Sequence, residues 1–159
     1  MDIFLLRHGI AEDAHAGQLD SERALTREGR EKLKRVLKRA REGGAAPTLI
    51  LSSPYRRAIE TAEIAAESLD YHSEIVRTQA LIPNASPGDA WNEIRSHRGE
   101  DSVLLASHEP LMSALLAHLL NSPALRVDFK KGALARIEAE SAGPVPNCAL
   151  KWLLTAALA

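Results

Sequence analysis

The chain has 159 residues, of which 45% are hydrophobic and 26% charged, and its formal net charge is -1. This length and composition predict a single globular domain over residues 1–159 with its own hydrophobic core. The near-zero net charge and the 4% of aromatic residues argue against nucleic-acid binding, which depends on basic surfaces or stacking platforms.

The remaining composition signals concern redox state, metals and membranes. Cys148 is the only cysteine and cannot form an internal disulfide, and no Cys/His cluster has the spacing of zinc ligands. The first residues lack the basic start of a signal peptide, and no apolar stretch reaches membrane-spanning length. We therefore expect a cytoplasmic protein with no metal, no cofactor and no membrane contact.

The first element of the chain is an apolar run at residues 3–6, followed directly by Arg7, His8 and Gly9. A short continuous apolar run is typical of a strand buried on both faces, and ligand sites of open α/β sheets lie at the carboxyl ends of such strands. An arginine offers a two-pronged contact for an oxyanion, and a neutral imidazole can act as a nucleophile or base. Taken alone, the same residues fit a strand end with two surface charges equally well.

The rest of the chain predicts alternating helices and strands. In chain order these are a polar loop at 10–21, a helix at 27–42, a strand at 48–51, a helix at 54–69, a weak strand at 74–78, a helix from 87, a strand at 103–106, a helix from 110, and strands at 133–139 and 148–154. Thr26 is the expected cap of the first helix, Ser53 with Pro54 the start of the second, and Ser86 with Asp89 the start of the third. The alternation predicts an α/β sandwich with a mostly parallel sheet, and the last two strands fit an antiparallel pair.

Polar residues follow three of the apolar runs. Arg7-His8 ends the first, Ser52-Ser53 ends the second and leads into Arg56-Arg57, and Ser107-His108 ends the third. Because the carboxyl ends of parallel strands meet at one sheet edge, two arginines, two histidines and two helix N-termini are expected in one pocket. Arginine forks and helix N-termini both favour a dianion such as phosphate. Periodicity does not decide between Arg56 and Arg57, and each residue alone has a plain structural explanation.

Three segments together resemble the signatures of the histidine phosphatase superfamily: Leu6-Arg7-His8-Gly9, the stretch from Ser52 to Ala62, and Ser107-His108. The segments Arg23-Ala24-Leu25-Thr26 and Lys130-Lys131-Gly132-Ala133 are similar to the short SixA-like phosphohistidine phosphatases, with Ala24 in place of a proline. The resemblance implies a three-layer α/β/α sandwich of the phosphoglycerate mutase-like type.

The resemblance also implies roles for individual residues. His8 would be the nucleophile that takes the phosphoryl group, and Arg7, Arg57 and His108 would hold the phosphate. The family spacing Ser-Pro-x-x-Arg-Ala selects Arg57 over Arg56. Arg23 would make a further substrate contact. No metal-ligand set accompanies these residues, so we expect arginines to neutralise the phosphate charge in place of a cation, without a cofactor.

One departure from the family bears on the substrate. Many superfamily members carry a glutamate proton donor after the third strand, and residues 81–89 contain no such motif; Asp89 and Glu93 are the nearby acids. An alkoxide leaving group benefits from a general acid, whereas the imidazole of a phosphoramidate depends on one less. We therefore expect a phosphatase that acts on a phosphorylated histidine of a protein, such as a histidine-containing phosphotransfer domain. The alternatives are a small-molecule phosphomonoesterase and a non-catalytic domain that binds phosphoproteins.

Overall fold

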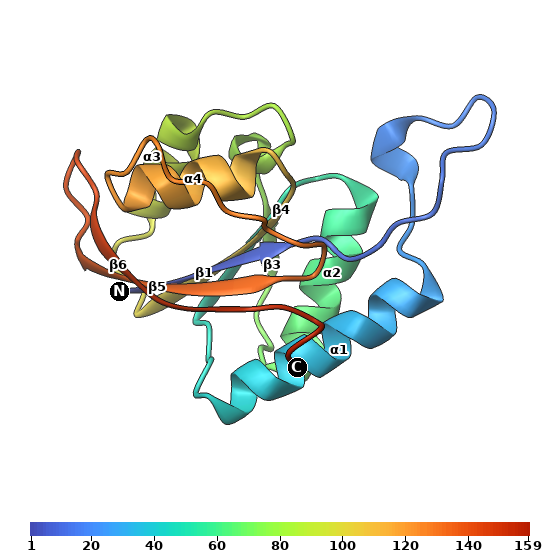
Figure 1. Cartoon of the computed structure of the whole chain (residues 1–159), viewed down its shortest axis with the longest axis horizontal. Helices are drawn as coiled ribbons and strands as arrows, with labels where there is room; N and C mark the ends of the chain where they lie inside the picture. The colour runs from blue at the N-terminus through green and yellow to red at the C-terminus, as the bar shows by residue number, and fades with distance from the viewer.

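A six-stranded sheet forms the centre of the computed structural model, which describes residues 1–159 (Figure 1). The strands are β1 (Asp2–Arg7), β2 (Leu49–Ser52), β3 (Ile75–Arg77), β4 (Ser102–Ser107), β5 (Leu134–Ser141) and β6 (Asn147–Leu154). The helices are α1 (Arg27–Glu42), α2 (Arg56–Ser68), α3 (Pro87–Ser96) and α4 (Leu111–Leu119), and two short 3₁₀ turns are η1 (Asp20–Glu22) and η2 (Gln79–Leu81). The strand order is β3-β2-β4-β1-β5-β6.

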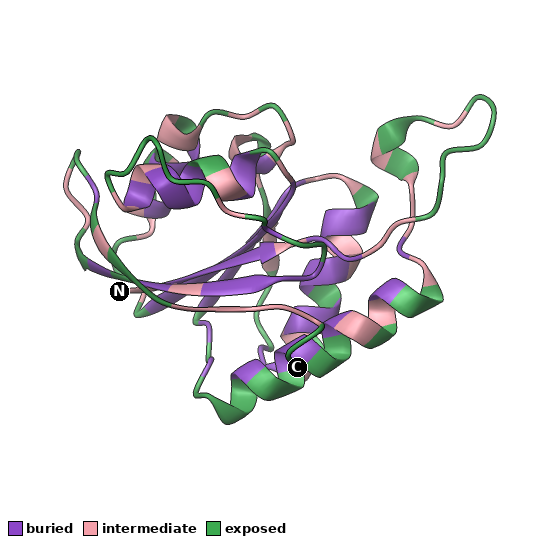
Figure 2. Cartoon of the chain, viewed as in Figure 1, coloured by how far each residue is buried: buried purple, intermediate pink, exposed green.

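The strand β1 shows why both faces of the sheet are covered. Successive side chains of a strand point to opposite faces, so Ile3 and Leu5 pack on one side and Phe4 and Leu6 on the other. The first pair belongs to a core cluster that includes α3 and α4, and the second pair to a cluster that includes α1 and α2. Figure 2 shows the buried strands between these two helical layers. The expected three-layer α/β/α sandwich is therefore confirmed.

The parallel pairing of the strands places the carboxyl ends of three strands at the same edge of the sheet. β1 pairs in parallel with β4, β4 with β2, and β2 with β3, while β5 runs antiparallel to β1 and β6 antiparallel to β5. Arg7 lies opposite Ser107, and Ser52 lies opposite Ala106. The carboxyl ends of β2, β4 and β1 therefore finish side by side.

The first residues of α1, α2 and α3 can be compared with the helix starts expected from the sequence. Thr26 caps α1 as expected, because its hydroxyl oxygen accepts from the backbone N–H of Gly29 at 2.9 Å. Ser86 likewise caps α3 through Asp89 N at 3.0 Å. The expected start of the second helix at Pro54 is wrong: α2 begins at Arg56, and Tyr55 is still extended, with φ -66° and ψ 137°.

No helix of the structure has both the length and the apolar character needed to cross a membrane.

Candidate active site

The backbone pairing of the sheet continues one residue past the strand ends and carries the polar side chains with it. His8 N donates to Ser107 O at 2.9 Å, and Ser53 N donates to Ala106 O at 3.0 Å. These bonds fix His8 and Ser53 at one edge of the sheet, next to the amino end of α2, and His108 directly follows the end of β4 at the same edge.

His8 is held in one tautomer by its own loop. Its Nδ1 lies 2.7 Å from the carbonyl oxygen of Gly9, which can only accept, so Nδ1 carries the proton and Nε2 presents a lone pair. Arg57 Nε donates to that Nε2 at 3.3 Å. Burial, followed by the positive charges of Arg57 and Arg7, lowers the pKa of His8 to about 4, despite the opposing effect of the Gly9 hydrogen bond. His8 is therefore a neutral imidazole at neutral pH with a nucleophilic nitrogen facing a guanidinium.

All three guanidinium nitrogens of Arg57 donate hydrogen bonds to other groups of the protein. Besides the contact with His8, its Nη1 donates to Asp20 O at 2.8 Å and its Nη2 to Asp20 Oδ2 at 3.0 Å. Arg57 is only 4% exposed, whereas its neighbour Arg56 is exposed and pairs with Glu60 at 3.5 Å. The two adjacent arginines thus differ sharply, and only Arg57 reaches His8.

His108 stands beside His8 with a different set of partners. The two rings make an edge-to-face contact, with centroids 5.0 Å apart. His108 Nε2 lies 2.8 Å from Ser53 Oγ, and its buried Nδ1 has no hydrogen-bond partner. Burial, with the neighbouring His8 and Arg57, lowers its pKa to about 2, so this ring is also neutral. The free Nδ1 is a polar group that a bound anion could satisfy.

Arg7 supplies the second guanidinium of the site. Its Nη1 donates to the carbonyl oxygen of Phe129 at 2.7 Å, and its buried Nε has no partner. Burial lowers its pKa, although Glu109 and Asp128 act in the opposite direction, and the group stays charged at neutral pH. Arg7 therefore has donor capacity left for a ligand.

A buried threonine joins the two sides of the site. Thr61 Oγ1 donates to Arg57 O at 2.7 Å and accepts from Gly9 N at 3.2 Å. A Cβ at Gly9 would lie 2.7 Å from Cδ1 of Leu33, so a larger residue at this position would require the Leu33 side chain to shift. These contacts fix the loop of His8 against the helix of Arg57.

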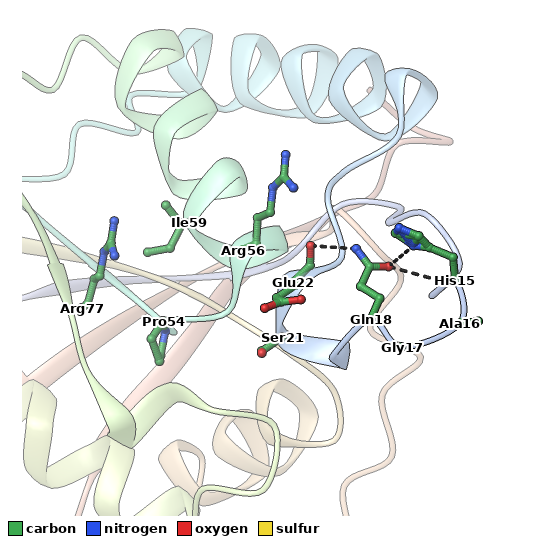
Figure 3. Close-up of a pocket in the computed structure, with 10 residues that line it drawn as sticks. All are labelled: His15, Ala16, Gly17, Gln18, Ser21, Glu22, Pro54, Arg56, Ile59 and Arg77. Atoms are coloured by element: carbon green, nitrogen blue, oxygen red, sulfur yellow. Dashed lines mark hydrogen bonds between the residues drawn. The ribbon is translucent and has the colours of Figure 1, made fainter.

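Two open pockets flank this cluster. One, of about 770 Å³, is lined by the loop after β1, the start of α2 and the end of β3, and includes Glu22, Arg56 and Arg77 (Figure 3). The other, of about 790 Å³, is lined in part by Arg7. No group of three or more His, Cys, Asp or Glu side chains is arranged to hold a metal ion. The cluster itself is suited to binding an oxyanion next to a neutral nucleophile.

Comparison with known proteins agrees with this geometry. The family model described as histidine phosphatase superfamily (branch 1) matches residues 3–82. The chain belongs to the histidine phosphatase superfamily. This membership and its SixA relatives make it a phosphatase, a hydrolase.

Individual relatives of this histidine phosphatase match over nearly its whole length. An uncharacterised protein of Picosynechococcus sp. is 31% identical over 97% of this chain and 99% of its own. The phosphohistidine phosphatase SixA of Escherichia coli is 28% identical over 98% of this chain and 94% of its own. A solved structure of the protein histidine phosphatase SixA with tungstate is 27% identical, with a TM-score of 0.86 over 99% of this chain and 98% of that one. The similarity to the SixA-like branch expected from the sequence is confirmed.

The structure brings most of the expected site residues of this phosphatase together. Arg7, His8, Arg57 and His108 gather at the sheet edge, as described above. Arg23 is linked to this cluster only through Asp20. Its Nε donates to Asp20 Oδ1 at 2.9 Å, and its Nη1 donates to Glu12 O at 3.1 Å.

Sequence reasoning missed three contributors. Asp20 lies in the predicted polar loop and had no expected role, although it is only three residues before the segment that matches the SixA-like pattern. Thr61 lies within the stretch quoted for the family but had no assigned contact. Ser53 was interpreted as a helix cap, which is wrong, because its hydroxyl accepts from Tyr55 N at 3.3 Å and meets His108 instead.

Proposed function

We propose that this protein is a phosphohistidine phosphatase that removes the phosphoryl group from a histidine of another protein, with His8 as the nucleophile. The observation that carries the proposal is the lone pair of His8 Nε2, held in a fixed tautomer and directed at Arg57. The similarity to the phosphohistidine phosphatase SixA of Escherichia coli supports the substrate class, and the similarity to the tungstate complex of SixA supports an affinity for a phosphate-like oxyanion.

The reaction would proceed in two displacements. In the first, His8 Nε2 attacks phosphorus in line, a P–N bond to His8 forms, and the P–N bond to the substrate imidazole breaks. The leaving imidazole nitrogen takes a proton from solvent. In the second, water attacks phosphorus, the bond to His8 breaks, and inorganic phosphate leaves. Arg7 and Arg57 would stabilise the charge on the phosphoryl oxygens, and His108 would contact one of them.

The arrangement of Asp20 and Glu93 favours a phosphoramidate over a phosphoester as the substrate. Asp20 is the acid next to Arg57, and although partial burial works against it, the hydrogen bonds and charges of Arg57 and Arg23 hold its pKa below the usual range. An ionised Asp20 cannot donate a proton to an alkoxide. Glu93 accepts from Thr78 Oγ1 at 3.2 Å and pairs with His97 at 3.1 Å, while Asp89 is part of the start of α3.

The proposal also covers the domain organisation, the cellular location, the independence from metal and the class of partner. Residues 1–159 would work as one domain in the cytoplasm without a metal, and a histidine-containing phosphotransfer domain is a suitable class of partner. Arg23 would contribute by holding Asp20, a more indirect role than a phosphate contact.

A substrate panel tests the proposal. The wild-type protein, treated with EDTA, is assayed for kcat/KM on a phosphohistidine protein, a phosphoserine peptide, sugar phosphates and phosphoglycerates, because this ratio measures discrimination between substrates. We expect the phosphohistidine protein to be turned over fastest, and Asp89→Asn and Glu93→Gln to retain that activity. A preference for a small phosphoester that collapses in either variant would instead assign the protein to the small-molecule phosphomonoesterases.

A further inference from the structure

The pocket beyond Arg7 carries an excess of positive charge. Its charged lining consists of Arg7, Lys32, Asp128, Lys130 and Lys131, four cations and one anion, and we call this set the basic shelf. By contrast, the pocket in Figure 3 contains none of the residues proposed to hold the phosphate. The basic shelf is therefore the flanking pocket that is continuous with the reaction site.

The charges of the basic shelf are unevenly neutralised. Lys32 pairs with Glu28 at 2.7 Å, and Lys130 pairs with Asp128 at 2.6 Å. Lys131 is exposed and takes part in no ion pair, and Arg7 Nε has no partner. The positive charge that is free to meet a ligand lies at Arg7 and Lys131.

The position of Lys131 is set by the backbone of the site itself. Gly132 N lies 3.1 Å from Arg7 O and 3.0 Å from His8 O, so the residue before it is held next to the proposed nucleophile. Gly132 has a φ of +75°, which a residue with a side chain adopts only with strain. Lys131 is thus presented by a turn of defined shape and not by a free loop.

We propose that the basic shelf binds carboxylate side chains that flank the phosphohistidine of a protein substrate, with Lys131 as the main contact. This proposal rests on the proposed function and adds a recognition rule to it. A ligand that places its phosphoryl group at Arg7 and extends across the basic shelf brings a second negative charge to the unpaired ammonium of Lys131. A protein segment suits the open form of the pocket, and opposite charges at such a rim speed association and improve selectivity.

The test uses two phosphohistidine peptides that differ only in whether glutamate or glutamine flanks the phosphohistidine on both sides. We expect the wild-type protein to favour the glutamate peptide by about fivefold or more in kcat/KM at low salt, with the preference shrinking as salt screens the charges. Lys131→Glu should abolish or reverse this preference, and the milder Lys131→Ala should reduce it. Lys38→Glu is the matched control, because Lys38 is an exposed, unpaired lysine on the far part of α1, and it should keep the preference.

The outcomes separate the two proposals. Equal turnover of both peptides by the wild-type protein, or an unchanged preference in a folded Lys131→Glu protein, would overturn the role of the basic shelf and leave the phosphohistidine activity standing. Turnover of small phosphoesters with no turnover of either peptide would overturn the proposed function. A preference for small substrates with a second phosphate over the glutamate peptide would show that the shelf recognises a metabolite, which also contradicts the proposal.

Discussion

His8 and His108 follow neighbouring parallel strands, and both are buried and neutral, yet their hydrogen bonds differ. Nδ1 of His8 is fixed by the Gly9 carbonyl, which turns the lone pair of Nε2 toward Arg57. His108 has its Nε2 at Ser53 Oγ and its Nδ1 without a partner. The same residue type at equivalent strand ends thus has two different arrangements, which fit the attack proposed for His8 and the anion contact proposed for His108. The partner of each ring nitrogen, and not burial, makes the difference.

Removing the His8 ring is the strongest way to test this division. Because only His8 has a fixed lone pair facing Arg57, His8→Ala should lower turnover by at least ~10³-fold, the scale of losing a member of a catalytic unit. The variant should also fail to become phosphorylated when mixed with substrate, while circular dichroism shows an intact fold. Comparable turnover in a folded His8→Ala protein would refute the assignment of His8 as nucleophile.

The arginine facing His8 should come next in effect. Arg57→Lys keeps the charge but loses the planar fork, so we expect a loss of roughly 10²-fold or more in kcat/KM, the scale of removing one preorganised donor. Arg56→Lys is the matched control and should stay near wild type, because Arg56 is exposed and pairs with Glu60. A larger loss in Arg56→Lys would mean that the wrong arginine has been placed at the phosphate.

His108→Ala tests whether His108 contacts the phosphate without acting as the nucleophile. The loss of one phosphate contact should cost about 10²-fold in turnover, but His8 should still accept the phosphoryl group, and a phosphorylated protein should be trapped by rapid quenching. If this variant forms no phosphoenzyme at all, the two histidines do not have separate tasks.

The pH dependence of the wild-type activity tests the lowered pKa of His8, and we expect it to give a smaller effect than the substitutions. A group with a lowered pKa stays neutral further into acid, so the activity that needs neutral His8 should be lost only as pH falls through about 4. With this pKa, about nine-tenths of the nucleophile remains neutral at pH 5, against about 3% for an ordinary histidine. The measurement is kcat/KM for an acid-stable small substrate, corrected for substrate ionisation. An acid limb centred near 6.5 would contradict the buried, neutral state of His8.

The fold and much of the cluster were predictable because their signals are local. Each buried strand is a continuous apolar run, and the parallel arrangement alone places Arg7, His8 and His108 at one edge. The choice of Arg57 over Arg56 came from family spacing, since both lie in the first turn of α2. Thr26 and Ser86 were correctly interpreted as caps because a cap bonds to a backbone group only three residues away.

Long-range contacts explain what could not be predicted. Asp20 meets Arg57 across 37 positions of the chain, through a loop whose path no periodicity describes. The Ser53-Pro54 pair is typical of a helix start, but here residues 53–55 lie outside the helix and α2 begins at Arg56. Ser53 meets His108 across 55 positions, so its hydroxyl serves a tertiary contact in place of a local cap.

The contact between Arg57 and Asp20 has a consequence for how quickly the product leaves. Since each nitrogen of Arg57 already donates in the free protein, phosphate entering the proposed site exchanges one partner for another and adds few new bonds. Asp20, in the 3₁₀ turn η1 that contacts α2, would compete for the guanidinium, and we expect it to speed departure of inorganic phosphate. Asp20→Asn should therefore make phosphate and tungstate stronger competitive inhibitors, and a weaker inhibition would show that Asp20 chiefly orients Arg57. By the same competition, we expect phosphate to be only a weak product inhibitor of the wild-type protein.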